Sequence, residues 1–233
     1  MKIITAVFSY IGQNKYERCL RALTHSIERT NPDADFQVLR LQPPAPVEGA
    51  YQGWVSNHIK LKAYAEQELN DNTIFVDADT VFLREAAFLF DKEFDVAIGR
   101  RTGGRVLYNG GVVLFKPTDK AKEFLESWSM ADNSMLYDQE FHQKWRKKYN
   151  GQNQASFGFL VEAYPDYVRL HEYPTSLVNA VEQDWPVLHK IDPVIVHVRK
   201  KLLEYAVSDF TIDQIPKKLR VAVKLWRDLE KDE

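Results

Sequence analysis

Two aspartates that follow an apolar strand are the residues best placed in this chain for chemistry. Residues 73–83 read TIFVDADTVFL, so Asp77 and Asp79 come where a strand predicted over residues 73–77 ends. Side chains two residues apart in an extended backbone point to the same side, and ligands of α/β sheets bind beyond the carboxyl ends of the strands. Two carboxylates aimed at one point suit Mg²⁺ or Mn²⁺, ions that commonly bridge to substrate phosphates. The alternative is that the two aspartates are solvated acids in a surface turn. The predicted buried strand directly before them favours a metal site.

The elements around this strand must position the two carboxylates. Apolar strands predicted at residues 2–9 and 36–41 precede it, and each is followed by a predicted helix, the second at 54–69. The first helix is indicated by apolar residues spaced three and four positions apart, namely Tyr16, Cys19, Leu20, Leu23 and Ile27. Strand alternating with helix predicts an α/β fold with a mostly parallel central sheet and helices on both faces.

The second half of the chain has a less regular pattern. Short strands are predicted at 94–98, 112–115 and 193–198, and helices at 120–130 and 137–149. We find no internal repeat, no linker and no sharp change of composition. The sequence therefore predicts one domain over residues 1–233.

Composition excludes several classes of protein. The 233 residues include 31 basic and 33 acidic ones, for a net charge of −2, so we expect no nucleic-acid partner. A single cysteine, Cys19, cannot form an intramolecular disulfide, which favours a reducing compartment and a cytoplasmic location. No apolar run approaches the roughly 20 residues that span a bilayer.

Two enzyme classes combine an apolar strand with an Asp-x-Asp motif. In haloacid-dehalogenase-like phosphatases the motif continues with Thr or Val, as it does here in Thr80 and Val81. Those enzymes need a later acidic pair after another buried strand, whereas the strand at 193–198 is followed by the basic residues 199–201. The other class is the glycosyltransferases of the GT-A fold, whose Asp-x-Asp holds the metal of a nucleotide-sugar.

The chain resembles the GT-A family that includes glycogenin and bacterial lipopolysaccharide galactosyltransferases. The resemblance covers about residues 2–201 and rests on segments that match in order. These are Lys60 on the helix before the Asp-x-Asp strand, Asn109-Gly110-Gly111 running into an apolar strand, the Asp138-Gln139 pair, and His197 late in the chain.

The resemblance implies a role for each matching residue. Asp77, Asp79 and His197 would hold Mn²⁺ or Mg²⁺. Asp138 would accept hydrogen bonds from donor-sugar hydroxyls, and Gln139 would line the sugar's β face near the anomeric carbon; both are the catalytic candidates. The residues implied for binding the nucleotide-sugar are Phe8, Ser9, Tyr10, Lys60, Asp77, Ala78, Asp79, Asn109, Gly110, Gly111 and Lys200.

Ordinary structural explanations remain open for several of these residues. A histidine in an apolar strand, such as His197, is usually a core residue, and a lysine on a helix is usually solvated. Asp138 opens a predicted helix, where the dipole favours an acid anyway. Asn109-Gly110 is also a hairpin-turn signal, and Tyr10 either stacks on a base or packs under the first loop.

The resemblance implies transfer of a sugar from a nucleotide diphosphate, with UDP the expected nucleotide, to a glycan or other hydroxyl acceptor, with retention of configuration. Residues 1–115 would form the nucleotide-sugar-binding half, 116–210 the acceptor side, and 211–233 a C-terminal amphipathic helix. A non-catalytic nucleotide-sugar binder is the remaining alternative.

The C-terminal helix carries an apolar stripe surrounded by basic residues. Such a helix can bind an anionic membrane surface, but more often its stripe docks on its own domain. We expect docking, with peripheral membrane contact as the alternative. The stripe consists of Ile215, Leu219, Ala222, Val223, Trp226 and Leu229.

Overall fold

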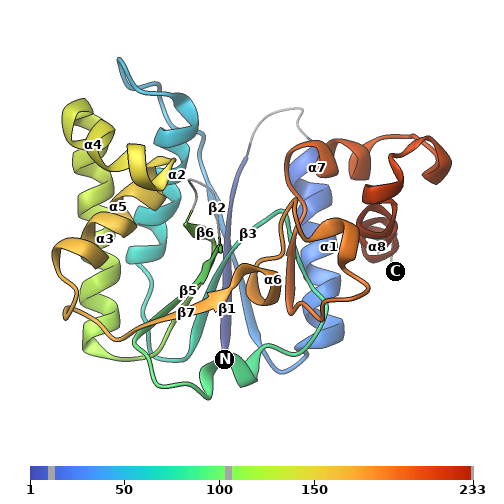
Figure 1. Ribbon diagram of the computed structural model, residues 1–233, viewed down its shortest axis with the longest axis horizontal. Coiled ribbons are helices and arrows are strands. Elements are labelled where there is room, and N and C mark those ends of the chain that lie inside the picture. The colour runs from blue at the N-terminus through green and yellow to red at the C-terminus, as the bar shows by residue number, and fades with distance from the viewer. Residues whose placement is uncertain (10–13, 103–106, 232–233) are drawn as a thin grey trace.

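The computed structural model describes residues 1–9, 14–102 and 107–231. Within these residues, a six-stranded sheet in the order β2-β1-β3-β6-β5-β7 forms the centre of the molecule. Helices cover both of its faces (Figure 1). This is the α/β architecture predicted from the sequence. Tyr10 lies outside the described residues.

The first half of the sheet is parallel. Strand β1 (Lys2–Phe8) pairs in parallel with β2 (Asp35–Leu41) and with β3 (Thr73–Asp77). Helices α1 (Lys15–Thr30) and α2 (Gln52–Ala65) make the two connections. The interior of β1 is buried, as its continuous apolar sequence predicts for a strand covered on both faces.

The second half of the sheet mixes directions. Strand β6 (Tyr108–Phe115) runs antiparallel to β3, and β5 (Val96–Arg100) runs antiparallel to β6. Strand β7 (Leu170–Pro174) then pairs in parallel with β5. Strand β7 was not predicted, because His171 and Glu172 interrupt its apolar residues and most of the strand is only partly buried.

A second, two-stranded sheet joins distant parts of the chain. Strand β4 (Thr80–Phe82) pairs antiparallel with β8 (Ile195–His197), and Thr80 lies opposite His197. The strand predicted at 193–198 is therefore present in shortened form, whereas β4 was not predicted. This pairing carries His197 to the carboxyl end of β3.

Side chains of the main sheet alternate between two apolar cores. Phe75 points into the core beneath α2, α3 (Asp119–Tyr137), α4 (Gln139–Tyr149) and α5 (Gln152–Ala163), whereas its neighbours Ile74 and Val76 face the core on the side of α1. The shorter elements are α6 (Thr175–Val178), α7 (Lys200–Val207) and the 3₁₀ helices η1 (Ala87–Phe90), η2 (Trp185–Val187), η3 (Ile212–Gln214) and η4 (Lys217–Leu219).

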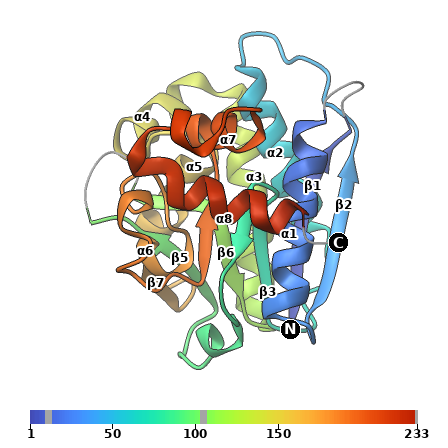
Figure 2. The ribbon, with the colours of Figure 1, turned by 90° about the vertical axis from the view of Figure 1, so that its right-hand side faces the viewer.

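The last helix, α8 (Arg220–Lys231), lies beside α1 and α7 (Figure 2). Its apolar stripe is buried, and Trp226 and Leu229 are fully inaccessible to solvent. Arg18 of α1 donates two hydrogen bonds to Glu230, at 2.6 and 2.7 Å. The stripe therefore docks on its own domain as expected, and membrane contact lacks support because the apolar face is covered. None of the helices in the described residues has the length and apolar character needed to cross a membrane.

Candidate functional site

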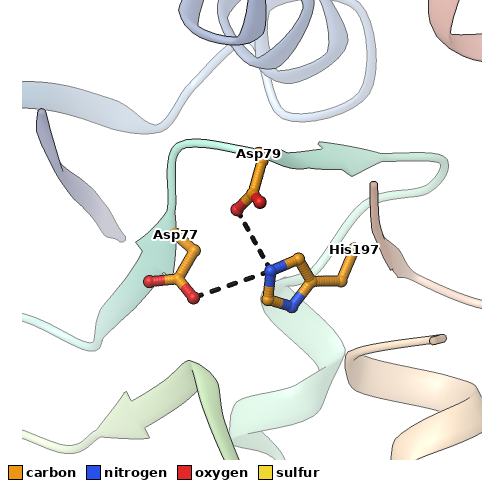
Figure 3. A group of neighbouring side chains, drawn as sticks. All are labelled: Asp77, Asp79 and His197. Atoms are coloured by element: carbon orange, nitrogen blue, oxygen red, sulfur yellow. Dashed lines mark hydrogen bonds and ion pairs between the residues drawn. The ribbon is translucent and has the colours of Figure 1, made fainter. Parts of the chain in front are cut away.

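Asp77, Asp79 and His197 converge where β3 ends. His197 Nε2 lies 3.0 Å from Asp79 Oδ1 and 3.6 Å from Asp77 Oδ2 (Figure 3). The backbone turns between β3 and β4 instead of staying extended, and the Thr80 hydroxyl donates to the Asp77 carbonyl at 2.7 Å. The Val198 N–H in turn donates to the Asp79 carbonyl at 2.7 Å. The turn and the β4–β8 pairing thus bring the three side chains together.

The geometry and chemistry of the three groups fit a divalent metal ion. Each offers one ligand atom, and these atoms lie within 4.8 Å of one another. Neighbouring ligands of an octahedral ion with bonds of about 2.1 Å are about 3 Å apart, close to the separations seen here. Carboxylates suit Mg²⁺ and Mn²⁺, while an imidazole favours a transition metal. The donor set therefore fits Mn²⁺ better than Mg²⁺.

A hydrogen bond at Nδ1, the ring nitrogen that faces away from the aspartates, fixes the orientation of the His197 ring. Its Nδ1 lies 3.1 Å from Oδ1 of Asn179, a fully buried residue that follows α6. An amide oxygen can only accept, so Nδ1 donates to Asn179 and Nε2 is the ring nitrogen that faces the two aspartates. This arrangement is typical of metal-ligating histidines, whose other ring nitrogen is held by an acceptor.

Gly111 lets the ring and the carboxylate pack closely. Val76 pairs with Val112 in the β3–β6 ladder, which places Gly111 beside Asp77. A Cβ atom on Gly111 would lie 2.5 Å from His197 Cε1 and 2.9 Å from Asp77 Oδ2. Because those separations are too short for any real Cβ, the site requires glycine here.

Lys60 of α2 forms an ion pair with Asp77 Oδ1. Burial opposes the charge on Lys60, but the attraction of Asp77 outweighs it and raises the pKa of the ammonium. Burial likewise opposes the charge on Asp77, but Lys60 and His197 outweigh it and hold the pKa of this carboxyl below its usual value. Both groups are therefore charged at neutral pH.

A cavity of about 640 Å³ opens beside the two aspartates. This volume suits a small-molecule ligand. Of the residues predicted from the sequence, Phe8, Lys60, Asp77, Ala78 and Asp79 line it. The other described residues that line it include Tyr16, Tyr51, Trp54, Asn57, Gly151 and Gln152.

The remaining predicted donor residues lie at different places. Ser9 follows Phe8, and its N–H donates to Leu41 O at 3.0 Å. Asn109 is buried behind the metal-ligand group, where its carbonyl accepts from Asn179 Nδ2 at 3.4 Å. Gly110 packs close to Asn153, with 3.1 Å between Asn153 Nδ2 and an added Cβ. Lys200 lines a second cavity and forms an ion pair with Glu182 at 3.2 Å.

Asp138 and Gln139 are not brought to the cavity beside Asp77. Asp138 caps α4, because its Oδ1 accepts from the Phe141 N–H at 2.9 Å, and it lines a separate surface pocket. Gln139 Nε2 donates to the Leu136 carbonyl at 3.2 Å. The helix-start explanation accounts for Asp138, and the structure gives neither residue a contact with the cavity that the predicted catalytic roles require.

Gln152 lines the cavity beside the two aspartates and was not predicted from the sequence. It is the first residue of α5, is fully buried, and lines the cavity. Its Nε2 donates to Asp132 Oδ2 at 2.9 Å and to Asp132 O at 3.1 Å. Asp132 is itself held by Ser156 at 2.9 Å, so the amide nitrogen faces the protein interior. Gln152 Oε1 has no hydrogen-bond partner among the described residues.

Solved structures with the same architecture are glycosyltransferases. One, involved in glycosylation of the major capsid of PBCV-1, is 15% identical, with 87% of this chain and 96% of that chain covered and a TM-score of 0.61. The galactosyltransferase LgtC, solved with donor and acceptor sugar analogs, is 13% identical, with 99% and 95% covered and a TM-score of 0.62.

GlyE of Streptococcus pneumoniae TIGR4 is 14% identical with a TM-score of 0.62; all of this chain is covered, but it spans 61% of the GlyE chain. At these identities the matches establish the fold, which is the GT-A glycosyltransferase fold. No curated protein sequence matches the chain significantly.

Residues 61–202 match the sequence profile of the nucleotide-diphospho-sugar transferases, more than half of the chain. The protein therefore belongs to this family and is a glycosyltransferase. The resemblance seen in the sequence is confirmed at this level, and the family match favours it over the phosphatase alternative.

Proposed function

We propose that the protein transfers a sugar from UDP to a hydroxyl of a glycan or other acceptor, with Mn²⁺ as its cofactor and with retention of configuration. The observation that carries this proposal is the convergence of Asp77, Asp79 and His197 at the edge of the cavity. The Asn179 hydrogen bond supports it, because it occupies Nδ1 and directs Nε2 toward the two aspartates, where it can act as a ligand.

The charges in the cavity suit a diphosphate only when a metal ion is present. Asp77 and Asp79 alone would repel a diphosphate, and Lys60 already neutralises one of them. A bound ion would supply positive charge between the carboxylates and the phosphate oxygens and would stabilise the departing nucleotide. Phe8, the last residue of β1, lines the side of the cavity that we assign to the nucleoside.

Gln152 is the residue that we assign to the donor sugar in place of Asp138 and Gln139. Its Nε2 is committed to Asp132, which leaves Oε1 to accept from a sugar hydroxyl or to face the anomeric carbon. The described residues that line the cavity include no acid besides the two aspartates of the metal-ligand group. This favours retention without a carboxylate nucleophile.

In the reaction, the bond between the anomeric carbon and the diphosphate oxygen breaks, and its electron pair leaves with UDP. The acceptor oxygen forms the new bond on the same face of the sugar. Its proton passes to the leaving phosphate oxygen, so charge and atoms balance without an enzyme base. Gln152 would support the positive charge that develops on the sugar.

The test is turnover of a panel of nucleotide-sugars with and without Mn²⁺, together with calorimetric titration of nucleotides. We expect UDP to bind clearly with Mn²⁺ and much more weakly after chelation, and one UDP-sugar to be hydrolysed slowly without acceptor. Gln152→Ala should lower the rate at saturating donor while leaving the Mn²⁺ requirement unchanged. Binding of UDP without turnover of any sugar would indicate a non-catalytic binder, and a preference for GDP would contradict the donor assignment.

A further inference from the structure

A second cavity, of about 750 Å³, adjoins the first one. The two share Gly151, which immediately precedes α5, so they lie next to each other at this residue. The second cavity lies between this point, the start of α7 and the 3₁₀ helix η4. We refer to it as the basic cavity.

The basic cavity concentrates positive charge in a chain whose net charge is −2. Glu182 is the acid among the described residues that line it. The cations that line it are Arg101, Arg199, Lys200, Lys201 and Lys218. A local excess of cations of this size attracts anions.

Glu182 pairs with three of the five cations, so its single negative charge leaves the cavity with an excess of positive charge. Arg199 donates two hydrogen bonds to it, at 3.0 and 2.9 Å, and Arg101 and Lys200 both pair with it at 3.2 Å. Burial opposes the charge on Glu182, but Arg199 and Lys200 lower its pKa to about 2. The carboxylate therefore stays charged and holds the two guanidinium groups in place, with side-chain exposures of 15% and 21%.

Lys201 and Lys218 are exposed and come from different elements, α7 and η4. Neither has an ion pair or hydrogen bond with another residue that the structure describes. Their charges are available to a ligand in the cavity at no cost to an existing contact.

We propose that the basic cavity binds a phosphate group carried by the sugar acceptor, so that the enzyme glycosylates phosphorylated acceptors. This inference rests on the proposed transferase function. The donor diphosphate would have its own counter-charges in the first cavity, namely Lys60 and the metal-ligand group. The shared Gly151 places the basic cavity next to Gln152, the residue that we assign to the donor sugar. A phosphate monoester carries close to two negative charges at neutral pH, which suits several cations better than a single carboxylate does.

The decisive variant is Lys201→Glu combined with Lys218→Glu. Both lysines are exposed and unpaired, so the substitutions leave the fold intact. Lys217→Glu combined with Lys224→Glu is the matched control: it makes the same charge change at exposed positions on η4 and α8 that do not line the cavity.

The experiment is calorimetric titration of glucose 6-phosphate into protein whose donor site is saturated with UDP and Mn²⁺. Neutral glucose and inorganic phosphate serve as comparisons. We expect glucose 6-phosphate to bind the unmodified protein and the control alike, and to bind the Lys201→Glu/Lys218→Glu variant at least about tenfold more weakly, because two attractions become repulsions. Equal affinity for all three proteins, or for glucose and glucose 6-phosphate, would overturn the proposal.

A lipid-borne phosphate is the alternative source of the same group. Sedimentation with phosphatidylcholine vesicles, with and without phosphatidic acid, separates the two sources. Binding that requires phosphatidic acid and both lysines would assign the cavity to a lipid phosphate, whereas vesicle binding independent of the lysines would contradict any phosphate role. Metal-dependent UDP binding, measured in the same samples, tests the transferase assignment separately and should be equal in all three proteins.

Discussion

Gly111→Ala should disable the metal-ligand group by steric displacement alone. The new Cβ would stand 2.5 Å from His197 Cε1 and 2.7 Å from His197 Nδ1, whereas ordinary contacts begin at 3.4 Å. The ring must therefore move by about 0.9 Å, against a tolerance of about 0.2 Å for metal–ligand distances. Nδ1 would also leave its hydrogen bond with Asn179.

The expected loss in Mn²⁺ affinity follows from these displacements. Removing a group that orients a metal ligand typically costs 10-fold to 100-fold in affinity, or about 1.4–2.7 kcal/mol. Overpacking also lowers the free energy of unfolding by about 1–3 kcal/mol. We would measure the Mn²⁺ concentration for half-maximal UDP-sugar hydrolysis, and the free energy of unfolding in urea without metal.

Gly158→Ala is the matched control for this experiment. Its Cβ would meet the Tyr149 ring at 2.4 Å, an equally severe contact that involves no member of the metal-ligand group. This variant should lose stability while keeping its Mn²⁺ requirement. If Gly111→Ala needs no more Mn²⁺ than the unmodified enzyme, the placement of His197 and Asp77 around an ion is wrong.

Three further substitutions test other parts of the structure. Asn179→Ala should raise the Mn²⁺ requirement about 10-fold to 100-fold because His197 loses its acceptor; an unchanged requirement would show that the hydrogen bond has no role in metal binding. Asp79→Asn should abolish metal-dependent turnover while thermal unfolding measured without metal stays unchanged, and full activity at low Mn²⁺ would refute its role as a ligand. Hydrogen bonds from Arg169 lower the pKa of the buried Asp95 from 3.8 to about 2. That shift contributes about 2 kcal/mol of stability above pH 4, which is lost as the pH falls toward 2. Urea unfolding at pH 6 and pH 3 should therefore show a smaller pH dependence for Asp95→Asn than for the unmodified protein.

The first half of the fold was predictable because its elements are strongly periodic or strongly apolar. The strand at Thr73–Asp77 and the helix over Lys15–Thr30 correspond closely to the predictions. The misses have a different cause. Strand β4 has three residues, and the five residues of β7 include His171 and Glu172, so pairing with a partner strand, and not local sequence, makes them strands. Helix α5 begins with the polar run Gln152–Gln154, which carries no apolar period.

The candidate site divides in the same way. The Asp-x-Asp motif and Lys60 could be predicted because they are tied to one strand and the helix before it. Gln152 could not, because its position in the cavity depends on the buried hydrogen bonds to Asp132, 20 residues earlier. The Asp138-Gln139 pair was predicted from its residue types and its match to the family motif. In the structure the pair lies at the start of α4 and does not line the cavity beside Asp77.

Because β4 pairs with β8, the proposed metal ion would link a strand from the first half of the chain to one near its C-terminal end. Asp79 and His197 are 118 residues apart in sequence, and the segment after His197 continues into helices that pack on α1. An ion bound only when both sides are in place stabilises the folded state by mass action, by about 2.7 kcal/mol at a hundred times its dissociation constant. Metal supply would then set the protein's resistance to unfolding as well as its activity. Because the ligands are far apart in sequence, metal binding would report that distant parts of the chain have reached their native arrangement.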